Sequence, residues 1–139
     1  MNIDGITNGT VLDHIKAGKA MRIYELLHLD RVSCSVAIIQ NAVSTKYGKK
    51  DIIKIDGILD LDYDAISYID PNITINHIRN GKNLRKERLA LPEHLTNVLV
   101  CKNPRCITSV EQGIPQKFYL ADREKRIYRC AYCDVEHRE

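Results

Sequence analysis

Four of the five cysteines in this 139-residue chain lie near its end and form two close pairs. Cys101 and Cys106 bound a Cys-x4-Cys segment, and Cys130 and Cys133 bound a Cys-x2-Cys segment that follows after 23 residues. Two such pairs can bring four thiolates to one tetrahedral centre, where Zn²⁺ binds sulfur at about 2.3 Å. Four sulfur ligands leave no coordination position for water, so the spacing predicts one structural Zn²⁺ per chain and no catalytic metal.

Other chemistries are open to these thiols. Disulfides require an oxidising compartment, and we expect neither a secretory leader nor an extracellular context for this chain. Iron–sulfur clusters also use four cysteines, but two separated close pairs favour zinc. His137 follows Cys133 closely and could compete as a ligand, although four sulfurs already satisfy the metal. The fifth cysteine, Cys34, is expected to be inert in a buried strand.

The charge balance bears on possible partners. The chain carries a formal net charge of +3, but from Asn97 onward it has only eight basic residues against six acidic ones. Four thiolates with one Zn²⁺ bring this segment close to neutrality, whereas a zinc lobe that binds nucleic acid carries a clear basic excess. We therefore expect no nucleic-acid partner, with a zinc-ribbon nucleic-acid-binding protein as the alternative. No apolar run approaches the length of a membrane span, which predicts a cytoplasmic protein without membrane contact.

The segments before the cysteines predict a sheet with two helices. Hydrophobic periodicity indicates strands over residues 3–15, 32–43, 50–55 and 72–78. Helices are expected over residues 17–28 and from Asp60 or Asp62 to the residue before Pro71. This β-α-β-β-α-β order is the ferredoxin-like pattern. The fold class is therefore α+β: a ferredoxin-like domain followed by a small antiparallel β domain held by zinc.

Alternation along two of these strands assigns side chains to faces. Val11, Asp13 and Ile15 are expected on one side of the first strand, with Leu12 and His14 on the other. In the segment 50–55, Lys50, Ile52 and Lys54 share one face. Taken alone, His14 would be a structural histidine, and the two lysines would be solvated residues of an edge strand.

The remaining segments connect the sheet to the metal and surround it. The basic run 79–88 is expected to be a linker or an exposed hairpin. Residues 97–100 are expected as a strand that delivers Cys101, and residues 117–120 and 125–129 as two strands joined by a turn. A lobe this small has a marginal core, so the metal should supply much of its folding free energy; structural zinc contributes about 10–16 kcal/mol in zinc-finger peptides.

Taken together, the two halves resemble the regulatory chain of aspartate carbamoyltransferase, over nearly the whole length. Each short motif is weak by itself, but their order and spacing are specific. The resemblance rests on residues 9–15 (GTVLDHI), 49–55 (KKDIIKI), 74–78 (TINHI), 91–93 (LPE) and 97–101 (NVLVC), and on both cysteine pairs.

The resemblance implies a non-catalytic regulatory subunit of the pyrimidine-biosynthetic enzyme. Residues 1–90 would form a nucleotide-binding allosteric domain that makes a homodimer, and residues 91–139 a zinc domain that contacts the catalytic chain. The implied effectors are CTP and ATP. Gly81 and Asn83 stand where the family has larger residues beside the base. The implied effector pocket consists of Ile6, Val11, Asp13, His14, Lys50, Lys54, Asn76, Ile78 and Lys86.

Overall fold

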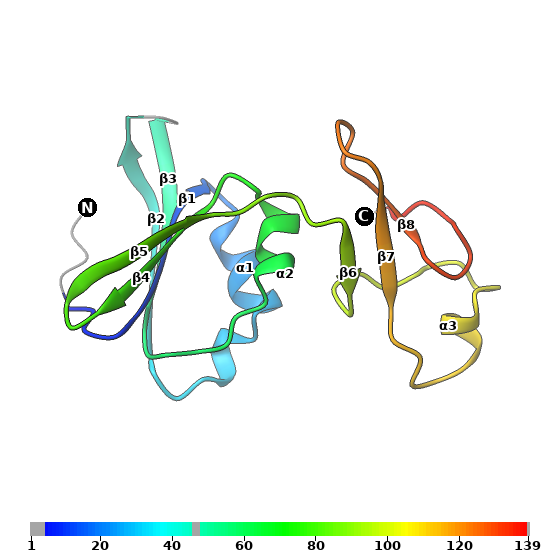
Figure 1. The fold of residues 1–139 in the computed structure, drawn as a ribbon, viewed down its shortest axis with the longest axis horizontal. Coiled ribbons are helices and arrows are strands. Elements are labelled where there is room, and N and C mark those ends of the chain that lie inside the picture. The colour runs from blue at the N-terminus through cyan, green and yellow to red at the C-terminus, as the bar shows by residue number, and fades with distance from the viewer. Residues whose placement is uncertain (1–4, 46–47, 139) are drawn as a thin grey trace. The chain divides into compact units, whose positions relative to one another are not determined.

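The chain folds into two compact units, Met1–Ala90 and Leu91–Glu139, which are seen in Figure 1. The structure is a computed structural model that describes residues 5–45 and 48–138. Within those residues, no helix is long and apolar enough to cross a membrane. Each unit has its own sheet, and the two are described separately below.

The first unit is an antiparallel sheet with two helices, in strand order β2-β3-β1-β4-β5. The order of its first six main elements confirms the predicted β-α-β-β-α-β pattern. Between α1 and β2 the chain also makes one 3-10 turn, η1. The elements are β1 Gly9–Lys16, α1 Ala20–Leu26, η1 Leu29–Arg31, β2 Ser35–Ser44, β3 Gly48–Asp56, α2 Tyr63–Ile69, β4 Thr74–Arg79 and β5 Lys82–Arg88.

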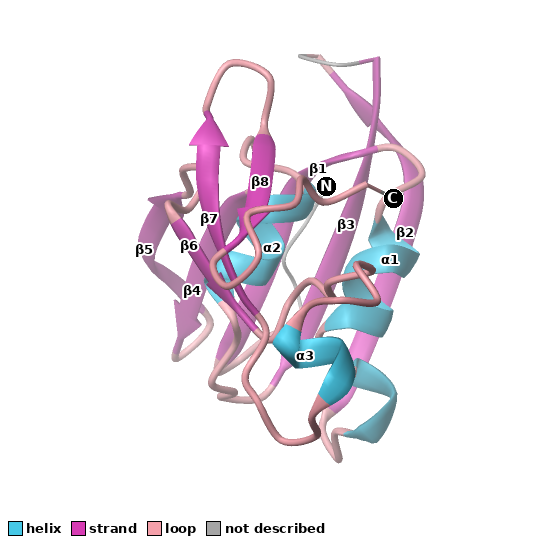
Figure 2. Ribbon diagram, turned by 90° about the vertical axis from the view of Figure 1, so that its right-hand side faces the viewer, coloured by secondary structure: helices cyan, strands magenta, loops and turns pink. Residues whose placement is uncertain are grey.

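One face of this sheet packs on both helices (Figures 1 and 2). Helix α2 begins where the Asp62 carboxylate accepts the Ala65 backbone N–H at 3.1 Å, and it ends before Pro71. Burial of this apolar layer is the main stabilising term for the unit. The layer includes Leu12, Ile23, Ile53, Ile55, Ile66 and Ile75.

Strand β5 resolves the two options for the basic run 79–88 in favour of the hairpin. Asn80 and Gly81 connect β4 to β5, and both have positive φ, 54° and 75°. An Asn-Gly pair with two positive φ angles matches the two-residue hairpin turn whose twist suits antiparallel strands. The hairpin adds a fifth strand at the sheet edge and brings residues 82–88 beside β4.

The expected alternation along the first strand is wrong beyond Leu12. His14 has φ of 59°, and the β1–β3 register shifts between Leu12 and Ile15. This β-bulge adds one residue to β1, so Ile15 joins Leu12 in the helix-facing core. The bulge also places the His14 ring 3.2 Å from the Thr74 hydroxyl.

The second unit is a three-stranded antiparallel sheet, β6-β7-β8, with one short helix. Leu95, Phe118 and Tyr128 form its buried apolar centre. The small antiparallel β domain agrees with the predicted fold class. Its elements are β6 His94–Thr96, α3 Ile107–Val110, β7 Lys117–Asp122 and β8 Ile127–Cys130.

Two strands of this unit depart from expectation. The strand expected at 97–100 is wrong, because β6 ends at Thr96 and Asn97 takes a positive φ of 58°. Asn97 instead bonds Gln116 twice, donating its backbone N–H at 2.7 Å and accepting at its side-chain oxygen at 3.0 Å. The strand expected from residue 125 begins at Ile127, because the preceding turn includes Arg126 with φ of 55°.

Candidate metal centre and candidate effector face

The four paired cysteines meet at one point in the second unit. Their sulfur atoms all lie within 4.8 Å of one another. The Sγ–Sγ distance is 3.6 Å for Cys101–Cys133 and 3.7 Å for Cys106–Cys130. Four sulfurs at about 2.3 Å from a tetrahedral ion lie about 3.8 Å apart, so the arrangement fits such an ion. Among the residues that the structure describes, no other group of three or more metal-binding side chains is this close.

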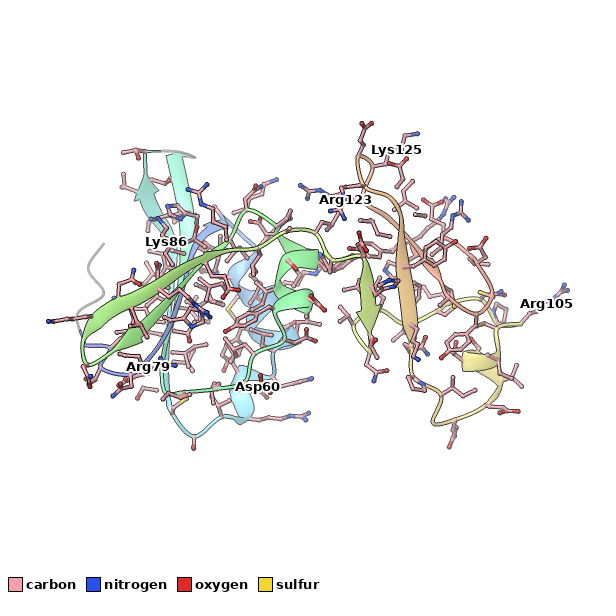
Figure 3. The ribbon with its side chains drawn as sticks, viewed as in Figure 1. Asp60, Arg79, Lys86, Arg105, Arg123 and Lys125 are labelled. Carbon is pink, nitrogen blue, oxygen red and sulfur yellow. The ribbon has the colours of Figure 1, made fainter. Side chains whose placement is uncertain are left out.

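Separate local structures hold the two pairs. The backbone N–H of Cys101 donates to the Gln116 side-chain oxygen at 3.0 Å, and Cys106 is the N-cap of α3. Arg105, between them, points outward (Figure 3). Cys130 ends β8, and the chain turns directly after it to present Cys133. None of the five cysteines, all of which lie among the described residues, forms a disulfide.

A hydroxyl contacts one of the sulfurs. Thr108 Oγ1 donates to Cys106 Sγ at 3.1 Å. Hydrogen bonds from the Thr108 hydroxyl and backbone N–H lower the pKa of the Cys106 thiol to about 7, whereas burial raises the pKa of Cys101 to about 12. Metals bind the thiolate, so Thr108 stabilises the ligating form of Cys106. His137 packs edge-on against Phe118 instead, with ring centroids 5.7 Å apart.

In the first unit, four of the residues implied by the resemblance form a single row across the sheet. Val11 of β1 pairs with Lys54 of β3 on one side and with Asn76 of β4 on the other. Asn76 pairs in turn with Lys86 of β5. Side chains paired in register point to the same face, so two ammonium groups and one amide share the sheet face opposite the helices.

An apolar cluster lies beside this row. It contains Ile6, Val11, Ile52 and Ile78, separate from the core that packs on the helices. Val11 is 1% exposed, and Lys54 and Asn76 are 9% and 8% exposed. The row therefore combines buried apolar surface with two largely buried polar groups and one exposed lysine, Lys86, which suits a ligand with a flat apolar part and a charged part.

The same face of the sheet carries further charged side chains on β1 and β3. The Lys50 ammonium forms a 2.9 Å ion pair with the Asp13 carboxylate. Burial opposes ionisation of Asp13, but hydrogen bonds from Lys50 and from the His14 backbone N–H outweigh it, so the pKa of Asp13 is lowered. Asp13 is therefore an ionised acceptor, held by a cation, at neutral pH.

A cavity of about 490 Å³ lies at the end of the face that carries His14 and Lys86. Its wall also includes Thr74 and Arg88, which the sequence interpretation did not include in the site. Thr74 pairs with both Asp13 and Arg88 across neighbouring strands. If residues 82–88 are recognised as a strand, Arg88 is expected on the same face as Lys86, because side chains two residues apart in a strand share a face. The cavity thus gathers His14, a hydroxyl and two cations.

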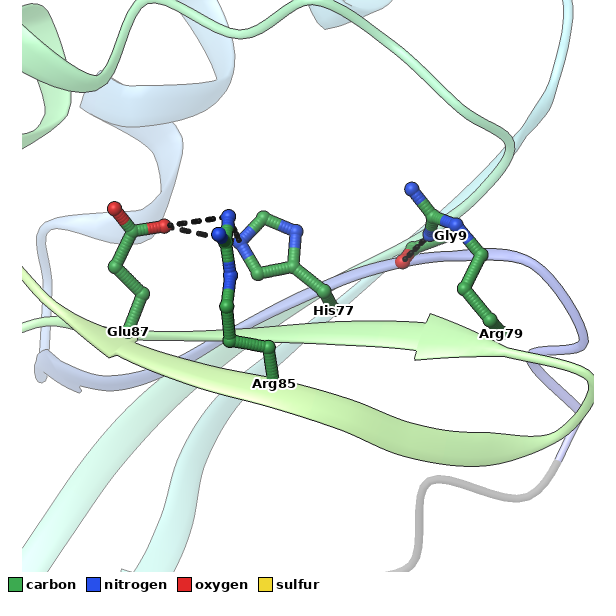
Figure 4. Close-up of polar contacts among 5 residues, drawn as sticks. All are labelled: Gly9, His77, Arg79, Arg85 and Glu87. Atoms are coloured by element: carbon green, nitrogen blue, oxygen red, sulfur yellow. Dashed lines mark hydrogen bonds and ion pairs between the residues drawn. The ribbon is translucent and has the colours of Figure 1, made fainter.

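The opposite face of the β4–β5 hairpin carries a second polar cluster (Figure 4). His77 Nε2 lies 3.0 Å from the Glu87 carboxylate, and the Arg85 guanidinium lies 3.5 Å from the same oxygen. Nearby, Arg79 donates to the Gly9 carbonyl at 3.2 Å. Lys86 lies between Arg85 and Glu87 on β5 (Figure 3). The contacts of Glu87 and Arg85 with His77 hold β5 beside β4 on the face opposite Lys86.

Comparison with known protein families matches both units separately. Residues 1–90 match the family described as aspartate carbamoyltransferase regulatory chain, allosteric domain. Residues 93–139 match the family described as aspartate carbamoyltransferase regulatory chain, metal binding domain. The two matches together cover nearly the whole chain.

Individual relatives carry the same description at high identity. The aspartate carbamoyltransferase regulatory chain of Clostridium botulinum is 51% identical over 134 residues, which cover 96% of this chain and 92% of the relative. That of Clostridium tetani is 50% identical over 135 residues, or 96% and 94% of the two chains. That of Bifidobacterium longum is 42% identical over 136 residues, or 98% of each.

Proposed function

The chain belongs to the family of aspartate carbamoyltransferase regulatory chains, and on that premise we propose that it binds CTP and ATP and transmits their binding to the catalytic chains of the enzyme. It has an allosteric domain and a metal-binding domain, and its relatives are named as regulatory chains. In this proposal the chain itself performs no chemistry and acts in pyrimidine biosynthesis in the cytoplasm.

The observation that carries the proposal is the row Lys54, Val11, Asn76 and Lys86. A nucleoside triphosphate has a flat base, a ribose with hydroxyl donors and several negative charges. Apolar surface at Val11 suits the base, and the ammonium groups suit phosphate oxygens. Further contacts are assigned to Ile6 and Ile78 at the base, Asp13 at the ribose, and His14 and Lys50 at the phosphates.

Within the metal-binding domain, the bound ion is proposed to be one Zn²⁺ per chain, held by Cys101, Cys106, Cys130 and Cys133. An all-sulfur tetrahedral site is typical of structural zinc. When bound, the ion supplies folding free energy to a 49-residue unit, and no step of catalysis. The thiolates hold the loops around α3 and after β8 together.

The same unit is proposed to contact the catalytic chain. Support comes from exposed apolar side chains around the cysteines, which range from 41% to 68% exposed: Val100, Ile107, Val110, Tyr132 and Val135. Exposed apolar side chains gathered on a small unit are typical of protein interfaces. The near balance of charge in this unit lacks the clear basic excess that is typical of zinc lobes that bind nucleic acid.

The first unit is proposed to form a homodimer. Strand β2 is at one edge of the sheet, and its Val43 is 89% exposed. An edge strand can pair with the same strand of a second copy.

The decisive experiment is reconstitution with the catalytic chain. Aspartate saturation curves are measured with and without CTP and ATP, at several nucleotide concentrations. The proposal requires the curve to shift with at least one of the two nucleotides, and the shift to vanish when this chain is left out. Curves that no nucleotide displaces, in a complex of verified composition, would remove the regulatory role.

A further inference from the structure

A second cavity, of about 270 Å³, lies on the β4–β5 hairpin, on the face opposite Lys86. Sites for drug-sized ligands are typically about 300–1,000 Å³, so this cavity suits a smaller ligand. We call it the arginine pocket, and its lining side chains are His77, Arg79, Leu84 and Arg85.

A β-bulge in β5 brings two consecutive side chains into the pocket. The β4–β5 register pairs His77 with Arg85 and then shifts, so that Leu84 is the extra residue of β5. Consecutive residues of a regular strand point to opposite faces, whereas a bulge changes the direction of a side chain. Arg85 therefore lines the pocket together with its neighbour Leu84.

The Arg79 guanidinium is held in place by the backbone. Its Nη1 donates to the Ile78 carbonyl at 2.7 Å and to the Gly9 carbonyl at 3.2 Å. A guanidinium has five N–H donors, so these bonds leave the N–H groups of Nη2 and Nε for another acceptor. Because the side chain is already ordered, a ligand that binds it loses little affinity to the cost of ordering.

His77 turns one ring nitrogen toward the pocket. Its Nε2 lies 3.0 Å from the Glu87 carboxylate and 3.4 Å from the Arg85 guanidinium. The Tyr63 ring packs edge-on against the imidazole, with centroids 6.3 Å apart. His77 is only 9% exposed, and no hydrogen-bond partner of Nδ1 is found among the residues that the structure describes. Figure 4 shows this nitrogen on the side of the ring that faces Arg79.

The side chains at the pocket carry a positive balance of charge. Arg79 and Arg85 stand against one carboxylate, that of Glu87, which lies 3.5 Å from Arg85. Lys82 pairs in register with Arg79 and adds an ammonium to the same part of the hairpin. Burial raises the pKa of the Tyr63 hydroxyl, so this neighbour is uncharged at neutral pH. The balance favours an anion, and guanidinium groups match the oxygens of phosphate in pairs.

We propose that the arginine pocket binds one small tetrahedral oxyanion, inorganic phosphate, between Arg79 and Arg85. Phosphate oxygens accept from the remaining N–H groups of both guanidinium groups, and from His77 Nδ1 when the ring is protonated. Glu87 stays on the Nε2 side of the ring. Four oxygens allow phosphate to face two guanidinium groups at once, whereas a carboxylate has only two. The site lies on the other face of the sheet from the proposed nucleotide site and does not depend on it.

The test is titration of the full chain with inorganic phosphate at constant ionic strength, in the absence of the catalytic chain. Calorimetry measures affinity, and NMR of the His77 ring reports where phosphate binds. Wild type is expected to show a saturable shift of the Nδ1 resonance, and acetate should bind more weakly. Arg79→Met and Arg85→Met should each weaken phosphate binding by about tenfold, the effect of one charge-assisted hydrogen bond. The Arg85 side chain is 65% exposed, so its replacement should leave the fold intact.

Two control variants locate the binding. Arg105→Met removes an arginine that points outward from the second unit, and it should bind phosphate like wild type (Figure 3). Lys86→Met removes a cation from the opposite face of the same strand, so the saturable shift at His77 should persist.

Each result decides for or against the pocket. Weaker binding in both pocket variants but not in Arg105→Met, together with the shift at His77, supports the inference. No saturable shift at His77, or wild-type affinity in Arg85→Met, overturns it. Weaker binding only in Lys86→Met assigns phosphate to the proposed nucleotide site and likewise overturns the pocket. An equal loss in all four variants shows an unspecific effect of charge and also contradicts the proposal.

Discussion

Lys54 offers the sharpest test of the effector face. Its side chain belongs to a central strand, β3, and pairs in register with Val11, and the residue is only 9% exposed. A cation in such a position is screened by water far less than a surface lysine. Replacing Lys54 with Ala should therefore impair effector binding, while the metal-binding unit, which we propose contacts the catalytic chain, remains unchanged.

The size of the effect follows from the contact that is lost. A hydrogen bond between a charged group and its partner contributes about 1.5–3 kcal/mol, which corresponds to about a ten- to a hundredfold change in Kd. Since an effector shifts the catalytic equilibrium only through its differential affinity, CTP and ATP responses should weaken together with binding. Calorimetric titration of the assembled complex, paired with aspartate saturation curves, measures both quantities.

Two matched variants separate charge from packing. Lys54→Met keeps the aliphatic stem and removes only the ammonium, so it should lose binding as Lys54→Ala does. Lys49→Ala removes an exposed lysine from the same strand and should bind like wild type. If Lys54→Ala binds both nucleotides normally, the placement of the pocket is wrong. If it fails to assemble with the catalytic chain, Lys54 has a structural role instead.

Three further predictions concern the metal centre and the Asp13 ion pair. Cys130→Ser should reduce bound zinc to well below one ion per chain and destabilise the second unit, as measured by metal analysis and circular dichroism; a variant that keeps metal and fold would contradict the four-sulfur site. Thr108→Val should speed zinc transfer to a chelator by about tenfold, whereas Thr108→Ser should not, because serine keeps the hydroxyl that donates to Cys106 and valine removes it. The pKa of Asp13 lies below its ordinary value of 3.8, so its contribution to stability is full above pH 3.8 and is lost as the pH falls through the lower folded value. Lys50→Met leaves burial opposed only by the His14 backbone N–H and the charge of His14, so NMR titration should find the Asp13 pKa higher than in wild type, and acid unfolding should begin at higher pH; an unchanged pKa would show that Lys50 does not hold Asp13.

Local sequence was sufficient for features that depend on neighbours along the chain. The two cysteine pairs predicted a common centre because each pair forms within one turn, and the four sulfurs do lie together. Alternation placed Lys50, Ile52 and Lys54 on one face, since side chains alternate along any extended strand. The order β-α-β-β-α-β followed from periodicity and from a capping aspartate at position 60 or 62, of which the structure selects Asp62.

Only the tertiary structure decided the features that depend on pairing between distant segments. Residues 82–88 form a strand because β4 supplies its hydrogen-bond partners, although their sequence is polar and basic. The bulge at His14 breaks the alternation, and it is found only in the register of β1 against β3. The row from Lys54 to Lys86 depends on the register of four strands, which no single strand encodes. The hydrogen bond between Asn83 and Asn76 likewise exists only once the hairpin has closed.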